Sequence, residues 1–134
     1  MMTPQLNHID HIHIQVSDRP AAESWYKAVL GLRRKASLES WAVPHGPLML
    51  ENESGTVVFA LFQRKPQEHD STIALNVSGQ QFLQWCEHLA QALAKELPHV
   101  DHGLAWSIYF DDPDGNPFEI TTYDYDFVRS ARQG

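Results

Sequence analysis

Polar and apolar side chains largely alternate over residues 9–16, which is the period of a β-strand. The spacing then becomes that of a helix, because apolar side chains recur three or four positions apart between residues 20 and 30. Pro20 suits the first turn of such a helix, and Gly31 suits its end. The sequence therefore predicts a strand followed directly by an amphipathic helix.

Short strands are predicted over the rest of the first half of the chain. The candidates are residues 38–43, 47–51 and 56–62, and the last of these has the clearest pattern. Turn-forming residues, including Gly46 and Gly55, separate them.

The second half of the chain repeats this order after a polar, proline-containing linker at residues 65–70. A strand is predicted at residues 71–77, a helix at residues 80–96, and two strands at residues 106–110 and 118–123. Because consecutive strands follow each helix, the expected fold class is α+β rather than alternating α/β.

This duplication predicts one domain over residues 1–134, built of two βαβββ modules. Module one spans residues 6–64, module two spans residues 71–123, and a C-terminal tail covers residues 124–134. In such a module a curved sheet carries its helix on one face. Two modules then leave a concave interior, where inward-facing polar side chains meet around a small molecule.

The charge balance argues against a nucleic-acid partner. The chain has 10 Lys and Arg against 17 Asp and Glu, and its net charge is −7 with histidine neutral. It is therefore a poor partner for nucleic acid. No apolar run approaches the roughly 20 residues of a membrane helix, and the first residues lack the pattern of an export signal. We expect a cytoplasmic protein without a membrane partner, in which the single cysteine, Cys86, forms no internal disulfide.

Two histidines on the first strand are the first candidates for chemistry. His11 and His13 are two positions apart, so a strand places both on one face. A single strand histidine is most often a packed core residue, but a facing pair requires donors, a ligand or a cation. Glu119 lies among apolar neighbours on the last predicted strand, where it either points to solvent or is paired with a cation.

Longer motifs around these residues resemble a known family. Residues 11–18 and 29–32 resemble the opening of vicinal-oxygen-chelate proteins, the glyoxalase, bleomycin-resistance and extradiol-dioxygenase superfamily. Residues 109–119 resemble the closing strand pair of the same proteins. The resemblance extends over residues 6–123 and implies the two-module fold around a small-molecule cavity.

The resemblance also implies a divalent metal ion, Fe, Mn, Zn or Ni. The family's first-strand histidine maps to His11, and its last-strand glutamate maps to Glu119. The family's second histidine would fall at Thr72, which is a poor ligand compared with imidazole. The third protein ligand is therefore open, with His69 and His13 as candidates.

His102, Tyr109 and Glu119 are also similar to the C-terminal signature of extradiol ring-cleaving dioxygenases. In that family the histidine and the tyrosine orient the catechol and handle protons, which implies catalytic roles for His102 and Tyr109. The local pattern alone slightly favours a plain loop histidine before a strand for His102. The residues predicted to bind substrate are His13, Thr72 and Trp106.

Three functions are compatible with these patterns. The first is a metal-dependent enzyme on a small oxygen-rich substrate, either an extradiol dioxygenase-like enzyme or a glyoxalase-like lyase or isomerase. The second is a metal-free protein that sequesters a drug or another small molecule, like the bleomycin-resistance members, and Thr72 favours it. The third is a regulatory subunit without chemistry. We expect the first function, in a homodimer whose modules pair within one chain or by exchange between two chains.

Overall fold

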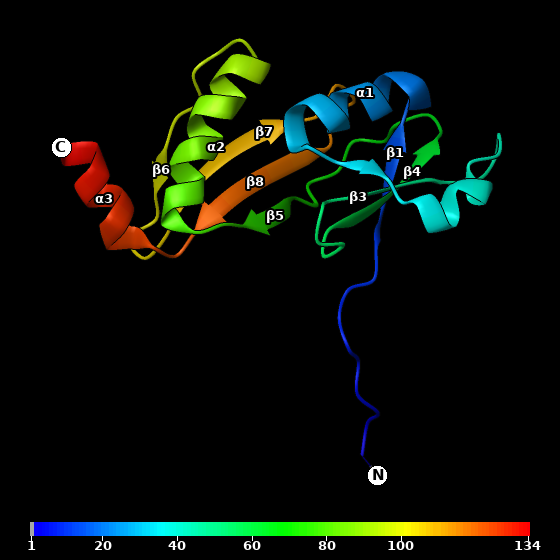
Figure 1. Ribbon diagram of the computed structural model, residues 1–134, viewed down its shortest axis with the longest axis horizontal. Helices are drawn as coiled ribbons and strands as arrows, with labels where there is room; N and C mark the ends of the chain where they lie inside the picture. Colours follow the sequence, from blue (N-terminus) through cyan, green and yellow to red (C-terminus); the bar gives the residue numbers. More distant parts are fainter. Residues whose placement is uncertain (1) are drawn as a thin grey trace. The chain divides into compact units, whose positions relative to one another are not determined.

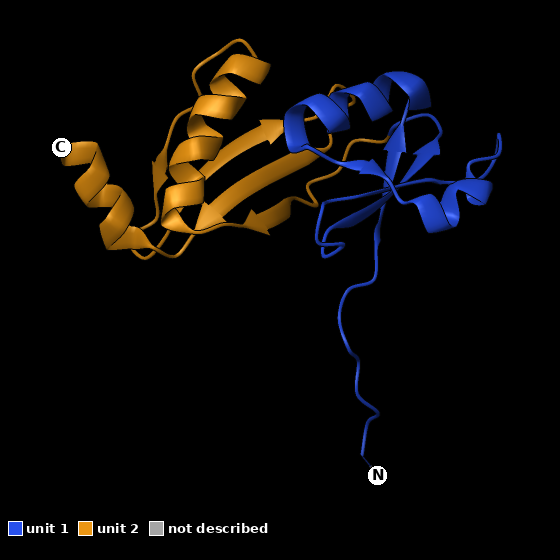
Figure 2. Cartoon of the chain, viewed as in Figure 1, with its two compact units in different colours: residues 1–66 blue, residues 67–134 orange. Residues whose placement is uncertain are grey.

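A computed structural model describes residues 2–134. The chain forms two compact units, residues 1–66 and residues 67–134 (Figure 2). Each unit contains a four-stranded mixed sheet and a long helix (Figure 1). Among residues 2–134, no helix has the length and apolar character needed to cross a membrane.

The first unit contains one βαβββ module. Its strand order is β1-β4-β3-β2, in which β1 and β4 are parallel and the other neighbours are antiparallel. Its elements are β1 (Ile12–Val16), α1 (Arg19–Leu30), β2 (Arg33–Arg34), the 3-10 helix η1 (Ala36–Trp41), β3 (Leu48–Glu51) and β4 (Val58–Gln63).

Local signals set the ends of α1, and packing holds it on one face of the sheet. The Asp18 side chain accepts a hydrogen bond from the backbone N–H of Ala21, and Gly31 ends the helix in the left-handed conformation at φ 71°. The helix residue Tyr26 is fully buried, with its ring 6.0 Å from that of Phe59 on β4. This face of the sheet forms the hydrophobic core of the unit.

The second unit repeats the module and adds a C-terminal helix. Its strand order is β5-β8-β7-β6, again with one parallel pair, β5 and β8. Its elements are β5 (Ile73–Asn76), α2 (Gly79–Ala92), β6 (Val100–Asp101), β7 (Trp106–Asp111), β8 (Pro117–Thr122) and α3 (Tyr125–Gln133). Ser78 and Gln81 form a reciprocal capping box at the start of α2. The prediction of two βαβββ modules in an α+β fold is confirmed.

One predicted strand is wrong. Residues 38–43 were expected to be extended, but they largely fall in η1 and its end. The backbone N–H of Lys35 still bonds Met49 of β3, whereas that of Leu38 bonds the Lys35 carbonyl three residues earlier. The chain therefore leaves the sheet after Lys35 and satisfies its backbone groups locally.

Two further differences concern helices. The second helix was expected to reach residue 96, but it ends at Ala92. Ala94 has a positive φ of 55°, and a right-handed helix cannot continue through a residue in that conformation. The segment expected to be a tail contains α3, which begins next to Asp124. The Asp124 carboxylate accepts a hydrogen bond of 2.6 Å from the backbone N–H of Gly79, so α3 is attached to the start of α2.

Candidate functional site

In the first unit, two imidazole rings face each other at the start of β1. The Nε2 atoms of His11 and His13 are 3.1 Å apart, and the rings are stacked with centroids 5.0 Å apart. The Asp10 carboxylate is 2.7 Å from Nδ1 of His11, and this hydrogen bond lowers the pKa of Asp10. Because α1 covers the opposite face of the sheet, the histidine pair lies on the face that the helix leaves open.

The donor set of this pair fits a transition metal. Two imidazole ligands at about 2.0–2.1 Å from one ion place their nitrogens roughly 3 Å apart. The Nε2 atoms of His11 and His13 have this separation, and the carboxylate on the far nitrogen of His11 is the usual way to orient a metal-binding imidazole. Among residues 2–134, no three or more His, Cys, Asp or Glu side chains gather into a complete metal site.

In the second unit, the acidic candidate lies beside a buried hydroxyl. Glu119 on β8 is the direct partner of Tyr109 on β7. The Ser107 hydroxyl, which is fully buried, donates a hydrogen bond of 2.7 Å to Oε2 of Glu119. Ser107 also lies 3.0 Å from the hydroxyl of Thr121. The Ser107 hydroxyl therefore holds one oxygen of the carboxylate, and the Tyr109 side chain also hydrogen-bonds with Glu119.

His102 and Tyr109 form the second half of this cluster. His102 Nε2 and the Tyr109 hydroxyl share a hydrogen bond of 2.9 Å. Burial raises the pKa of Tyr109, and the negative charge of Glu119 raises it further. A phenol with a raised pKa keeps its proton at neutral pH, and the hydrogen-bond partner of this phenol is an imidazole.

Three other predicted residues have different surroundings. Trp106 lies on the opposite face of β7, where it is buried, stacks on Tyr125 and donates its indole N–H to the Tyr125 carbonyl at 3.2 Å. Both ring nitrogens of His69 are engaged, one with Asn116 at 3.0 Å and one with the backbone N–H of Ser71 at 3.1 Å. Thr72 is exposed and directly precedes β5. The structure therefore does not bring Trp106 together with Tyr109 and Glu119.

Two residues near the predicted site were not identified from the sequence. Ser107 shares the face of Tyr109, as the period of two in β7 would have indicated. Asp10 is adjacent to His11, but an aspartate before a strand carries no distinctive pattern.

Strand register shows how the two modules correspond. In the first unit His13 on β1 pairs with Ala60 on β4, and in the second unit Ala74 on β5 pairs with Glu119 on β8. His13 thus corresponds to Ala74, and His11, two positions earlier, corresponds to Thr72. Module one therefore has imidazoles at these positions, whereas the carboxylate of module two, Glu119, corresponds to Ala60 of module one.

Residues 8–120 match the family model of the Glyoxalase/Bleomycin resistance protein/Dioxygenase superfamily. The chain belongs to this superfamily. Among curated proteins, no sequence is significantly similar to the chain.

Solved structures of the superfamily share the fold. A glyoxalase/dioxygenase from Nostoc punctiforme has a TM-score of 0.67 and 21% identity, and the match covers 92% of this chain and 96% of that one. The genomically encoded fosfomycin resistance protein FosX from Listeria monocytogenes has a TM-score of 0.67 and 17% identity, covering 95% and 99% of the two chains. A glutamate-to-glutamine mutant of FosX, solved with Mn(II) and 1S,2S-dihydroxypropylphosphonic acid, has a TM-score of 0.68 and 18% identity over 94% and 97%.

Proposed function

We propose that this superfamily member is a divalent-metal-dependent enzyme that acts on a small oxygen-rich substrate, with extradiol dioxygenase-like chemistry. The observation that carries the proposal is the hydrogen bond between His102 and Tyr109, next to Glu119 in the strand register. A glyoxalase-like lyase or isomerase requires the glutamate but gives this histidine–tyrosine pair no evident role.

The proposed metal ligands are His11 and Glu119. His13 is the proposed additional ligand, because its Nε2 faces that of His11 at 3.1 Å. His69 is a weaker candidate, since a bond to metal would break its contact with Asn116 or Ser71. A bound divalent ion would supply Lewis-acid stabilisation of charge on substrate oxygens.

The remaining steps belong to the protein's own groups. His102 is proposed to accept a proton from a substrate hydroxyl, and Tyr109 is proposed to donate its proton to a developing oxyanion. Ser107 holds Oε2 of Glu119 in one orientation. His13 and Thr72 are proposed to contact the substrate. Trp106 is not included, because it is buried on the helix side of its sheet.

The first test measures metal binding. The full chain is stripped with a chelator and titrated with Mn(II), and with Fe(II) under anaerobic conditions, by calorimetry. We expect Glu119→Gln and His11→Asn to abolish or strongly weaken uptake with an unchanged circular dichroism spectrum. His45→Gln removes an exposed loop histidine and serves as the matched control. Uptake that is unchanged in Glu119→Gln would refute the ligand assignment.

The second test measures chemistry. Oxygen consumption on addition of catechol to the Fe(II)-loaded protein would support dioxygenase-like activity. Tyr109→Phe and His102→Gln should then lower the rate without changing metal affinity. Metal binding without oxygen consumption, for catechol and substituted catechols alike, would refute the dioxygenase-like assignment.

One observation favours the alternative of a metal-free small-molecule binding or drug-sequestering protein. The positions in module two that correspond to His11 and His13 are Thr72 and Ala74, neither of which binds a divalent ion well. No detectable uptake of any divalent ion by the wild-type chain would select this alternative.

We also propose that the protein is a homodimer, as closed two-fold pairs are the commonest soluble assemblies.

A further inference from the structure

A cavity of about 330 Å³ lies in the first unit, away from the histidine pair. Its lining includes Leu48, which pairs with Leu61 of β4, and Gln63, which pairs with Val16 of β1. These positions share the sheet face of Phe59, against which Tyr26 of α1 packs. His13 projects from the other face. The cavity is therefore separated from His11 and His13 by the thickness of the sheet.

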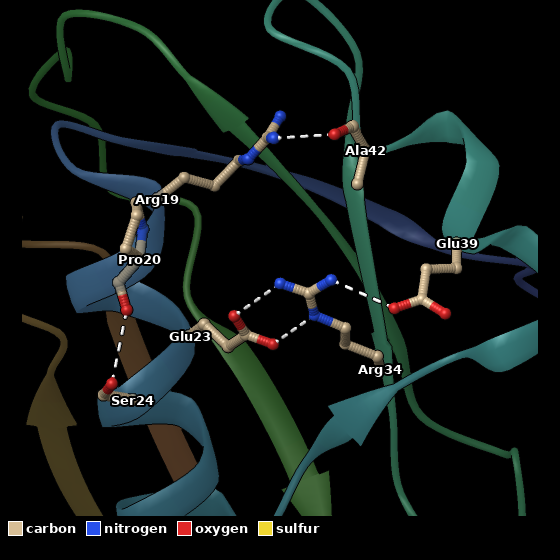
Figure 3. Close-up of polar contacts among 7 residues, drawn as sticks. All are labelled: Arg19, Pro20, Glu23, Ser24, Arg34, Glu39 and Ala42. Carbon is tan, nitrogen blue, oxygen red and sulfur yellow. Dashed lines mark hydrogen bonds and ion pairs between the residues drawn. The ribbon is translucent and has the colours of Figure 1, made fainter.

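Two arginines line this cavity, and each is held in place by other partners. Arg19, in the first turn of α1, donates to the carbonyl oxygens of Val43 at 2.9 Å, Gly46 at 2.7 Å and Ala42 at 3.1 Å. In Figure 3 its side chain extends from the helix to the Ala42 carbonyl. These bonds use three of the five N–H donors of the guanidinium group, and they fix its plane against the loop.

Arg34 of β2 is held between two carboxylates, as Figure 3 shows. It donates to both oxygens of Glu23, at 2.6 and 3.0 Å, and to Glu39 at 3.1 Å. The hydrogen bond from Arg34 lowers the pKa of Glu23. The carboxylate of Glu23 is thus already paired. Each guanidinium group uses three of its five N–H groups in the bonds named above, so each arginine retains two for a ligand.

The rest of the lining combines apolar surface with one amide. Pro20, Pro44 and Leu48 supply apolar contacts, and the side-chain oxygen of Gln63 is fixed by the backbone N–H of Arg19 at 2.8 Å. That bond leaves the amide NH2 of Gln63 as a further donor. The volume is at the lower end of the range of ligand pockets, and the lining combines apolar side chains with a few polar groups.

We propose that this cavity binds a small monocarboxylate with a compact apolar group. The carboxylate accepts hydrogen bonds from Arg19 and Gln63, and the apolar group contacts Pro44 and Leu48. Planar guanidinium donors that are held in place match a carboxylate well, because little side-chain freedom is lost on binding. This proposal does not depend on the proposed metal chemistry, so its test is independent of the role of His11 and His13.

The test uses the full chain, labelled with ¹⁵N and titrated with benzoate and with benzylammonium. The two probes have a similar ring and opposite charge. We expect saturable benzoate shifts in residues 42–46 and at the Arg19 side chain, and no comparable shifts with benzylammonium. Binding of benzylammonium as tight as that of benzoate would overturn the assignment of charge, and the absence of saturable benzoate binding would overturn the site.

Two variants test the contribution of Arg19 and that of the cavity volume separately. Arg19→Gln should weaken benzoate about tenfold or more, the loss expected for a hydrogen bond to a charged group. Ala42→Leu fills the cavity from the loop and keeps the backbone carbonyl that Arg19 uses, so it tests the site even where Arg19→Gln lowers stability. Arg33→Gln, the neighbouring exposed arginine of β2, removes the same charge and should leave affinity unchanged. Undiminished affinity in Ala42→Leu, or an equal loss in Arg33→Gln, would refute the proposed site.

Discussion

Replacement of Ser107 by alanine tests how Glu119 is held. Ser107 is fully buried, and its hydroxyl lies 2.7 Å from a carboxylate oxygen of Glu119. Hydrogen bonds to charged groups contribute about 1.5–3 kcal/mol to stability. Glu119 is only half-buried and regains water when the hydroxyl is removed, so the lower end of this range applies. We expect Ser107→Ala to lower the free energy of unfolding by about 1.5 kcal/mol.

The same replacement should also weaken metal uptake. Groups that orient a metal ligand typically contribute 10–100-fold to affinity, so we expect a loss of about tenfold. Urea denaturation followed by circular dichroism measures stability, and calorimetric titration of the stripped protein with Mn(II) measures affinity. Ser24→Ala is the control, because Ser24 is an exposed helix serine whose hydroxyl donates to the Pro20 carbonyl at 3.3 Å. A Ser107→Ala variant with wild-type stability and wild-type affinity would show that the hydroxyl does not hold the carboxylate.

Three further predictions concern other parts of the chain. Gly79→Ala should lower the stability of the second unit by about 1–3 kcal/mol in calorimetry. The reason is that a Cβ would lie 2.6 Å from the ring of Phe127 and 2.8 Å from Cβ of Asp124, and an unchanged melting temperature would contradict this contact. Burial raises the pKa of the Cys86 thiol to about 11, so alkylation of the folded protein by iodoacetamide should reach half its maximal rate near pH 11. A midpoint near the ordinary thiol value of about 8.5 would contradict that burial. Light scattering should give twice the chain mass of 15.3 kDa, and a mass of 15.3 kDa at micromolar concentration would refute the dimer.

The fold could be predicted because its signals are local and occur twice. The change from strand period to helix period near Pro20 gave the first helix almost to the residue, and the same change in the second half gave the second helix. Residues 38–43 were misassigned because an apolar residue at every second or third position is also typical of a 3-10 turn. The last sheet bond of this segment is that from Lys35 to Met49, after which Leu38 bonds the Lys35 carbonyl, and no local pattern encodes where the sheet pairing ends.

Only part of the site was accessible to the same reasoning. The shared face of His11 and His13 follows from a spacing of two, and the structure places their rings together. The partnership of Ser107 with Glu119 depends instead on the register between β7 and β8, which the sequence does not fix. Trp106 is predicted to bind substrate, but strand alternation in β7 places it on the face opposite Tyr109.

The correspondence between the modules supports one further prediction, a gain of metal affinity in Thr72→His. Thr72 lies two positions before Ala74, the register partner of Glu119, so its side chain shares the face of that carboxylate. A histidine there would have the same register relation to Glu119 as His11 has to Ala60. The replacement should cost little stability because Thr72 is exposed, and an added imidazole ligand should raise Zn(II) affinity by about tenfold or more. The control is Thr3→His, an exposed threonine outside both modules. If Thr3→His binds Zn(II) as tightly as Thr72→His, or if neither exceeds the wild-type chain, the second-module position does not face the metal site. The glutamate would then have to be reassigned to binding the substrate directly.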